Sequence, residues 1–446
     1  MTNKQLVLNQ VLEKVNPSKE EINLIEQGLK IFSENLKKRI SHLGIKAEIF
    51  VGGSFAKKTM IKKDKYDVDV FLRFEPGYKE ISEITKKLLK EIKNVSVIHG
   101  SRDYFRIKIN KEFTIELIPV LKVSKPELSE NITDLSYSHV KYINNKIKNK
   151  KILDEIKLAK AFCYANLCYG AESYVHGFSG YSLELLVYHY KTFEKFLKEM
   201  IKKPKKENKH TGIWTKEYEE KYSDLNKKII IDIEKKYSSK SQILMDLNSA
   251  KLESPIILID PTYKQRNAAA ALSEKTFERF KQAAEEFLKN PSLKSFEIKK
   301  TDLEKIKDNA TKKKYEFILL EAKTNKQEGD IAGSKLLKFY EHLDLEIKKD
   351  FNVKENGFNY NNQKSARFFF VVKIKPEILF EGPYAKDLEH SKDFKKKHKD
   401  YVIKKGRIYS KEKPKFQDIK KFIQFWKTKY AVKIKEMYIE KLEIKN

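Results

Sequence analysis

Cysteine is nearly absent from the 446-residue sequence, which contains only Cys163 and Cys168. These cysteines stand five residues apart in a segment with helical periodicity, where their side chains would point away from each other. We therefore expect no disulfide between them. No histidine cluster accompanies them, so the sequence gives no sign of a zinc site either.

Long apolar runs are absent too. No uninterrupted run approaches the roughly 18–20 residues needed to cross a bilayer. The first residues also lack the apolar core of a secretory signal peptide. Together with the scarcity of cysteine, these absences predict a reduced, cytoplasmic protein rather than a secreted or membrane protein.

Acidic residues are outnumbered, with 63 Asp and Glu against 93 Lys and Arg and a formal net charge of +30. An excess of this size favours a polyanionic partner, above all nucleic acid. Because arginine occurs only eight times, the excess is almost entirely lysine, and the composition of an AT-rich genome is the alternative explanation. With 40% hydrophobic and 12% aromatic residues, the chain should fold, and its length suits two to four domains.

The first part of the chain predicts a small α/β or α+β domain. Ser18 and Glu21 have the spacing of a capping box, and apolar residues at helical spacing from Ile22 to Ile40 predict a helix. The glycines at 52–53 predict a turn between two strands. We expect strands over 47–51, 66–74, 104–109 and 113–123, and a helix over 79–93.

Packed helices are expected in the middle of the chain, and mixed strands and helices beyond Pro291. Apolar periodicity predicts helices within 152–162, 181–197 and 274–288, whereas the charged stretch 202–211 predicts a loop or linker. The strongest later signals are strands over 315–321 and 366–374, a helix over about 330–347, a hairpin around Gly406 and a helix over 416–428.

The segment from Gly52 to Phe71 carries the clearest chemical pattern. Because residues i and i+2 of a strand share a face, Asp67 and Asp69 should point together while Val68 points into the core. Such a pair repels unless a cation lies between, and Mg²⁺ binds carboxylate oxygens together with phosphates. Gly53 and Ser54, after a strand, would let backbone N–H groups and a hydroxyl approach phosphates. A solvated edge strand is the simpler alternative.

A third acid, Glu116, lies in the predicted strand 113–123. Its neighbours Ile115 and Leu117 are apolar, and an acid in such a strand is costly unless it meets a metal or another cation. The three acids therefore predict a site for two Mg²⁺ ions, which can stabilise the attacking and leaving oxygens of phosphoryl transfer.

The Gly-Ser and Asp-x-Asp pattern with a later acid resembles the head of polymerase β-type nucleotidyltransferases. On these residues alone the chain could be a poly(A) polymerase, an oligoadenylate or cyclic-nucleotide synthase, or a tRNA-end polymerase. Two further blocks, Gly177-Phe-Ser-Gly-Tyr181 and Arg266-Asn-Ala-Ala269, occur in the order seen in archaeal-type (class I) CCA-adding tRNA nucleotidyltransferases. The resemblance covers residues 20–290 closely and the C-terminal part more loosely.

The resemblance implies an α+β multidomain fold with a polymerase β-type nucleotidyltransferase head, a helical neck and an α/β body and tail. The expected ranges are 1–135 for the catalytic head, 136–290 for the neck that binds the base and triphosphate, and 291–446 for the tRNA-binding body and tail. It implies that Asp67, Asp69 and Glu116 bind metal, that Gly53, Ser54 and Lys57 contact the nucleotide phosphates, that His139, Lys160 and Tyr169 bind the triphosphate, and that Arg266 reads the base.

Simpler interpretations exist for several of these positions. His139 lies in a stretch rich in Ser and Tyr that suggests a turn, where it would be a surface histidine. Lys160 would be a solvated helix lysine, and Tyr169 a core or helix-end tyrosine. Two positions depart from the family pattern, because Glu116 stands where Asp is common and Lys57 where Arg is usual. The lysine-rich stretch around 202–228 has no assigned role.

The implied activity is addition of C, C and A to the tRNA 3′ end from CTP and ATP, without a nucleic-acid template and with release of pyrophosphate. Its partners would be the tRNA acceptor stem and 3′ end, and a homodimer is common in the family. One alternative is a nucleotidyltransferase with another acceptor, such as a poly(A) polymerase or an oligonucleotide signal synthase. The other is an inactive RNA-binding module.

Overall fold

The helix predicted from the capping box is α2 (Lys19–His42), which follows α1 (Asn3–Val15) in the computed structural model. The Ser18 side chain accepts a hydrogen bond from the Glu21 backbone, and the Glu21 carboxylate accepts one from the Ser18 backbone, as predicted. The structure describes residues 3–100, 102–202, 224–298 and 301–445. The chain divides into two units, Met1–Lys299 and Lys300–Asn446.

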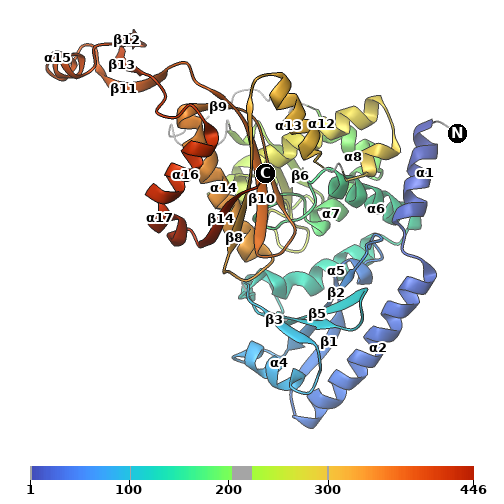
Figure 1. The fold of residues 1–446 in the computed structure, drawn as a ribbon. Coiled ribbons are helices and arrows are strands. Elements are labelled where there is room, and N and C mark those ends of the chain that lie inside the picture. Colours follow the sequence, from blue (N-terminus) through green and yellow to red (C-terminus); the bar gives the residue numbers. More distant parts are fainter. Residues whose placement is uncertain (1–2, 101, 203–223, 299–300, 446) are drawn as a thin grey trace. The chain divides into compact units, whose positions relative to one another are not determined.

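A five-stranded mixed sheet forms the first part of the first unit (Figure 1). The strand order is β1-β2-β5-β4-β3, in which β2 and β5 run parallel and the other neighbours run antiparallel. Helices α2 and α4 pack on this sheet, and their apolar residues share its core. The elements are β1 (Ala47–Val51), β2 (Tyr66–Phe74), α4 (Ile81–Leu89), β3 (Val95–Ile98), β4 (Tyr104–Lys108) and β5 (Phe113–Leu121).

These elements confirm the predicted strands and helix, with two additions. Strand β3 was not predicted, and the glycine turn after β1 is the short helix α3 (Gly53–Ala56). The alternation of β2 is as predicted, because Val68, Val70 and Leu72 are completely buried while Asp67 is exposed.

The rest of the first unit is mostly helical, around a core rich in phenylalanine that includes Phe162, Phe193 and Phe280. The predicted helices at 152–162, 181–197 and 274–288 are present, and 181–197 is divided into two helices at Lys191 and Thr192. The helices are α5 (Ser136–Lys146), α6 (Lys150–Ala165), α7 (Gly180–Tyr190), α8 (Phe193–Met200), α10 (Lys240–Asp246), α11 (Ser249–Leu252) and α12 (Glu274–Lys289).

A small parallel pair of strands, β6 (Ile229–Asp232) and β7 (Ile256–Ile259), accompanies these helices and was not predicted. Short 3-10 turns occur at Pro126–Leu128, Ile132–Leu135 and Leu293–Phe296. The loop predicted at 202–211 lies, apart from Lys202, outside the described residues.

The second unit contains a four-stranded antiparallel sheet with helices on both faces. Phe368 and Phe370 of β10 pack against α14 and α16, whereas Phe369 packs against α13. The predicted strands, the helix between them and the helix at 416–428 are present, and β9 and β14 are additional. The elements are α13 (Leu303–Lys312), β8 (Glu316–Thr324), α14 (Asp330–Asp350), β9 (Phe351–Tyr360), β10 (Ser365–Ile374), α16 (Ile419–Lys429), α17 (Ala431–Glu436) and β14 (Ile439–Lys445).

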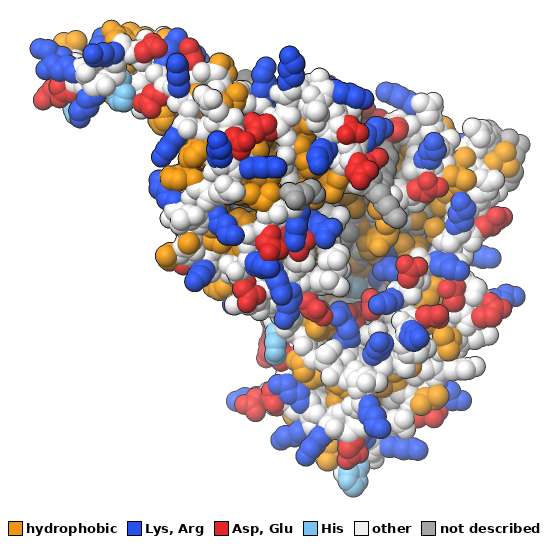
Figure 2. Space-filling view, viewed as in Figure 1, with side chains coloured by type: hydrophobic (Ala, Val, Ile, Leu, Met, Phe, Trp, Pro, Cys, Tyr) orange, Lys and Arg blue, Asp and Glu red, His pale blue; other side chains and the backbone are white. Residues whose placement is uncertain are grey.

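A separate three-stranded sheet in this unit contains β11 (Ile378–Tyr384), β12 (Tyr401–Lys404) and β13 (Arg407–Glu412), with α15 (Leu388–Lys397) beside it. The hairpin predicted around Gly406 joins β12 to β13, and Gly406 has the positive φ that such a turn requires. On the face shown in Figure 2, Lys and Arg side chains are spread among Asp and Glu side chains. Within the described residues, no helix has the length and apolar character of a membrane span.

Candidate active site

Two of the predicted acids face each other across the parallel strands β2 and β5. In the register of this pair, Asp69 is the partner of Glu116, and Asp67 is the partner of Thr114. Asp67 is exposed, whereas Asp69 and Glu116 are half-buried. Burial, followed by repulsion from Glu116, raises the pKa of Asp69 to about 6. The structure thus brings the predicted acids together on neighbouring strands, where the charge of Glu116 disfavours the charged form of Asp69.

The loop after β1 approaches this group more closely than a side chain would permit. Gly53 has a φ of +60°, and a Cβ on it would lie 1.8 Å from the Asp69 Oδ2 atom. The Gly52 N–H donates a 2.8 Å hydrogen bond to the Asp69 carbonyl. Ser54 follows in α3 and lines a cavity of about 30 Å³, together with Asp67 and others. Close contact with β2 therefore explains both glycines, in addition to the phosphate binding that the sequence predicts there.

Glu116 also has a partner that the sequence did not reveal. Arg106 of β4 donates hydrogen bonds from Nη2 and Nε to Glu116 Oε1, at 2.9 and 3.2 Å. Within the part of the chain that the structure describes, no three Asp, Glu, His or Cys side chains are gathered as metal ligands. The donor chemistry nevertheless fits a divalent ion, because Asp67, Asp69 and Glu116 offer carboxylate oxygens that repel one another without a cation. An arginine in the predicted strand 104–109 was the sequence signal that could have indicated Arg106 as this partner.

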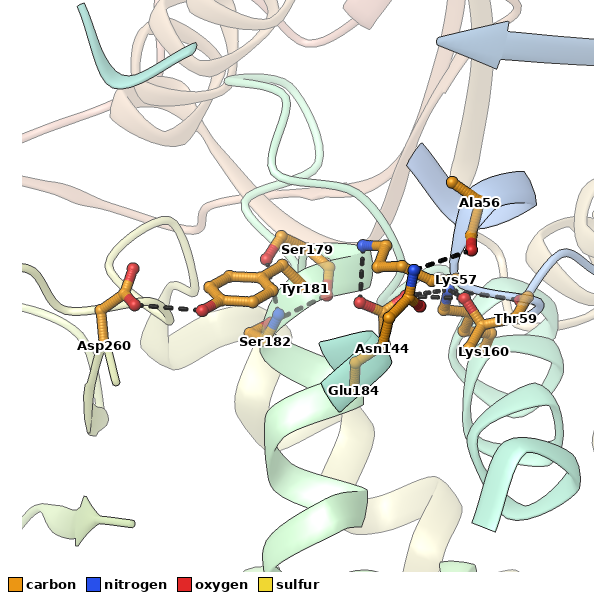
Figure 3. A network of polar contacts seen from close by, with 10 residues as sticks. All are labelled: Ala56, Lys57, Thr59, Asn144, Lys160, Ser179, Tyr181, Ser182, Glu184 and Asp260. Atoms are coloured by element: carbon orange, nitrogen blue, oxygen red, sulfur yellow. Dashed lines mark hydrogen bonds and ion pairs between the residues drawn. The ribbon is translucent and has the colours of Figure 1, made fainter. Parts of the chain in front are cut away.

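A buried carboxylate, Glu184 of α7, joins two of the predicted lysines (Figure 3). Lys57 lies 2.6 Å from Glu184 Oε2, and Lys160 lies 2.7 Å from Oε1. The Thr59 hydroxyl donates to Glu184 Oε1 and accepts from Lys160, both at 2.7 Å. Lys57 and Thr59 follow α3, whereas Lys160 and Glu184 lie on α6 and α7, so this cluster ties the loop after the first strand to the helices.

The charges of this cluster are stabilised by one another. Glu184 is completely inaccessible and Lys160 is only 1% exposed, so the interpretation of Lys160 as a solvated lysine is wrong. Although burial opposes its charge, the ammonium groups of Lys160 and Lys57 lower the pKa of Glu184 to about 2. Burial lowers the pKa of Lys160 to about 8, which leaves it charged at neutral pH. The sequence signal for Glu184 was an acid in the apolar run 183–186.

A second buried carboxylate, Asp260, gathers His139, Tyr181 and Arg266. Arg266 Nη1 lies 2.6 Å and His139 Nε2 lies 3.1 Å from Asp260 Oδ2. The Tyr181 hydroxyl donates to Oδ1 at 3.0 Å, and the His139 ring stacks on the Tyr181 ring at 4.2 Å. The cluster thus brings together two predicted site residues, His139 and Arg266, whereas Asp260 and Tyr181 were not predicted as site residues.

The simpler interpretation of His139 as a surface histidine in a turn is wrong, because it lies on α5 and is only 9% exposed. Burial lowers its pKa, although the Asp260 carboxylate works in the opposite direction. Arg266 Nε is buried and has no hydrogen-bond partner among the described residues. Asp260 thus holds the guanidinium through Nη1, and the Nε donor is left without a partner among the described residues.

Tyr169 lies beside Lys160. A Cβ placed on Gly180 would lie 3.1 Å from the Tyr169 hydroxyl and 3.7 Å from Lys160 Nζ, so the glycine leaves room for both groups. Tyr169 is half-buried, and burial raises its pKa, so it stays protonated at neutral pH. Ser54, Asp67, Lys160 and Tyr169 line the same small cavity. The Tyr181 ring connects the clusters, because Lys57 Nζ and Arg266 Cζ lie 5.8 and 5.7 Å from its centroid.

Most of the chain is similar in sequence to known proteins. Residues 29–135 match the family described as "nucleotidyltransferase domain", and residues 154–297 match "tRNA nucleotidyltransferase, second domain". The CCA-adding enzyme of Nanoarchaeum equitans is 33% identical over 81% of this chain and 83% of its own length. That of Methanocaldococcus jannaschii is 29% identical over 91% and 86%. Among solved structures, the Cid1 poly(U) polymerase aligns with 67% of this chain and 100% of its own, at 11% identity and a TM-score of 0.48.

Proposed function

Since the chain belongs to the CCA-adding enzymes, we propose that Asp67, Asp69 and Glu116 are the catalytic carboxylates with which it adds C, C and A to tRNA. The family acts on the tRNA 3′ end with CTP and ATP. The observation that carries this assignment is the register of β2 and β5, which sets Asp69 opposite Glu116 beside the loop of Gly53.

Nucleotidyltransferases of this kind use divalent metal ions. We propose that two Mg²⁺ ions bind to Asp67, Asp69 and Glu116, since carboxylate oxygens are the protein ligands that Mg²⁺ prefers. When bound, the ions would stabilise the negative charge that develops on the attacking and leaving oxygens. The chain itself holds the carboxylates on two adjacent strands, and the neighbouring residues Val68 and Ile115 are buried in the core.

The nucleotide phosphates would lie between the loop after β1 and the helices. Gly53 and Ser54 supply backbone N–H groups and a hydroxyl, and Lys57 supplies an ammonium group. We assign His139, Lys160 and Tyr169 to the triphosphate. The common cavity of Ser54, Lys160 and Tyr169 supports this assignment.

Arg266 is the residue that we assign to the base of CTP or ATP. Its guanidinium is a planar set of donors that suits the acceptor atoms of both bases. Asp260 fixes one end of the group, and the unpartnered Nε supports a role in contacting a ligand.

The remaining assignments concern the parts of the chain. We assign catalysis to residues 1–135, base and triphosphate binding to 136–290, and tRNA binding to 291–446, which largely corresponds to the second unit. Double-stranded RNA is bound through its shape, phosphates and 2′-hydroxyls, for which a lysine-rich surface is suited. We also propose that the protein is cytoplasmic and that it forms a homodimer.

The test is an extension assay with tRNA that lacks its terminal CCA, with labelled CTP and ATP. Growth by three nucleotides that stops after CCA is the expected result. Continued addition of A, or extension of unrelated RNA, would instead assign the chain to a nucleotidyltransferase with another acceptor. No incorporation by a protein that binds tRNA would indicate an inactive RNA-binding module and overturn the proposal.

A further inference from the structure

We propose that Arg106 is a positioning residue that holds Glu116 away from the other two carboxylates, so that divalent ions compete with an internal ion pair for this acid. The inference rests on the proposed function of Asp67, Asp69 and Glu116 as the metal site. It adds a determinant of metal affinity that lies outside the three acids.

The sheet places the three residues in one row. Glu116 lies on β5, where its register partner on one side is Asp69 of β2 and on the other side is Arg106 of β4. Side chains at directly opposed positions of neighbouring strands share a face of the sheet. Glu116 therefore has an acid on one side and a guanidinium on the other, at the spacing of adjacent strands.

The hydrogen bonds show which neighbour Glu116 contacts. Two guanidinium nitrogens of Arg106, Nε and Nη2, donate to the same atom, Glu116 Oε1, and hydrogen bonds between charged groups are stronger than those between neutral groups. Asp69 makes no such contact with Glu116, and their charges repel. Without a metal ion, the guanidinium is therefore the cation that contacts the third acid directly.

The ion pair is also one that can open. The Arg106 side chain is 39% exposed, so its guanidinium can be hydrated when it leaves Glu116. A partly exposed pair of this kind contributes little to stability, and it should compete with a divalent ion without preventing its binding. The same exposure allows a glutamine side chain at position 106 to be hydrated.

The test measures binding of Mn²⁺, without nucleotide or tRNA, by electron paramagnetic resonance of the free ion on the full chain. Arg106→Gln should tighten Mn²⁺ binding by roughly threefold to fivefold, the size expected from a partly exposed ion pair. Arg39→Gln is the matched control, because it removes the same charge from α2, where Arg39 pairs with Glu91. It should leave Mn²⁺ binding unchanged. Unchanged or weaker binding by Arg106→Gln would overturn the inference.

A second variant separates charge from geometry and covers the case in which Arg106→Gln does not fold. Arg106→Lys keeps the charge but loses the two-nitrogen contact, and it should tighten Mn²⁺ binding by less than the glutamine variant does. Binding equal to that of the wild type in Arg106→Lys would overturn the role of the two-nitrogen contact.

Asp69→Asn distinguishes the inference from the proposed function. If this variant binds Mn²⁺ as the wild type does, the three acids are not the metal site and the proposed function fails with the inference. If Asp69→Asn loses Mn²⁺ while Arg106→Gln binds it like the wild type, the metal site stands and the role of Arg106 is wrong.

Discussion

Asp69 and Glu116 are register partners across the parallel strands β2 and β5, and the residues on either side of each are completely buried. Val68 and Val70 flank Asp69, while Ile115 and Leu117 flank Glu116. The period of two in each strand thus sets both acids on the face opposite to the core. A one-residue shift of either strand would bury an acid, so the pairing of the apolar residues also fixes the pairing of the acids.

Gly53→Ala should impair both folding and activity, because a Cβ at this position would overlap the Asp69 carboxylate. Gly44→Ala is the matched control, since Gly44 has nearly the same φ, +62°, but no atom within 4 Å of its Cβ position. The control should cost about 1–2 kcal/mol of backbone strain in urea unfolding and keep its activity. Gly53→Ala should cost more and lose most CCA addition. Equal effects of the two variants would show that contact with Asp69 is unimportant.

Glu184→Gln should destabilise the first unit strongly. The variant leaves Lys57 and Lys160 buried without their counter-charge, and breaking a buried pair from one side costs roughly 3–5 kcal/mol in urea unfolding. Glu443→Gln is the control, because Glu443 also lies between two lysines, Lys441 and Lys445, but on a solvent-accessible strand. Its unfolding should match that of the wild type. A Glu184 variant as stable as the Glu443 variant would contradict the account of this cluster.

Glu184 should also make the protein sensitive to acid. Its pKa is about 2 in the folded chain, compared with an ordinary value of 4.5, so the unfolded state binds more protons between these pH values. The contribution of this carboxylate to stability is therefore complete above about pH 4.5 and declines as the pH falls toward 2. The difference in unfolding free energy between wild type and Glu184→Gln should shrink over this range. A difference that is the same at pH 7 and pH 3 would refute the assignment.

Arg266→Ala should raise the KM for both CTP and ATP by roughly tenfold or more, the effect of losing hydrogen bonds from a charged donor. The KM for tRNA should change little, because the guanidinium is assigned to the base. Arg279→Ala is the control, since Arg279 is an exposed arginine that binds the Leu167 carbonyl. An increase in the KM for tRNA alone would place Arg266 at the RNA rather than at the nucleotide.

The sequence predicted those features that local spacing determines. The two-residue period of β2 and β5 revealed Asp67, Asp69 and Glu116, and the capping box revealed the start of α2. Helix α5 was not predicted, because its apolar residues are few and stand among Ser, Tyr and Asn. Strands β3 and β6 were missed because each has only four residues and depends on its partner strand.

The partners of the site residues could not be predicted from spacing. Lys57 and Glu184 are 127 residues apart in the chain and meet only because α7 packs behind the loop after β1. The same holds for Tyr181 and Asp260, which are 79 residues apart. Arg106 stands only 10 residues from Glu116, but the contact depends on the exact register of β4 against β5. The motifs indicated the site residues. The residues of opposite charge that hold them in place could be identified only from the fold.

The most direct test of the account is CCA addition by Asp69→Asn, with tRNA binding measured on the same preparation. The variant keeps the size of the side chain and removes its charge, so it should bind tRNA lacking CCA like the wild type. It should incorporate essentially no CMP or AMP, even with saturating Mg²⁺. Incorporation at the wild-type rate by Asp69→Asn would contradict the claim that the carboxylates of β2 and β5 perform the reaction.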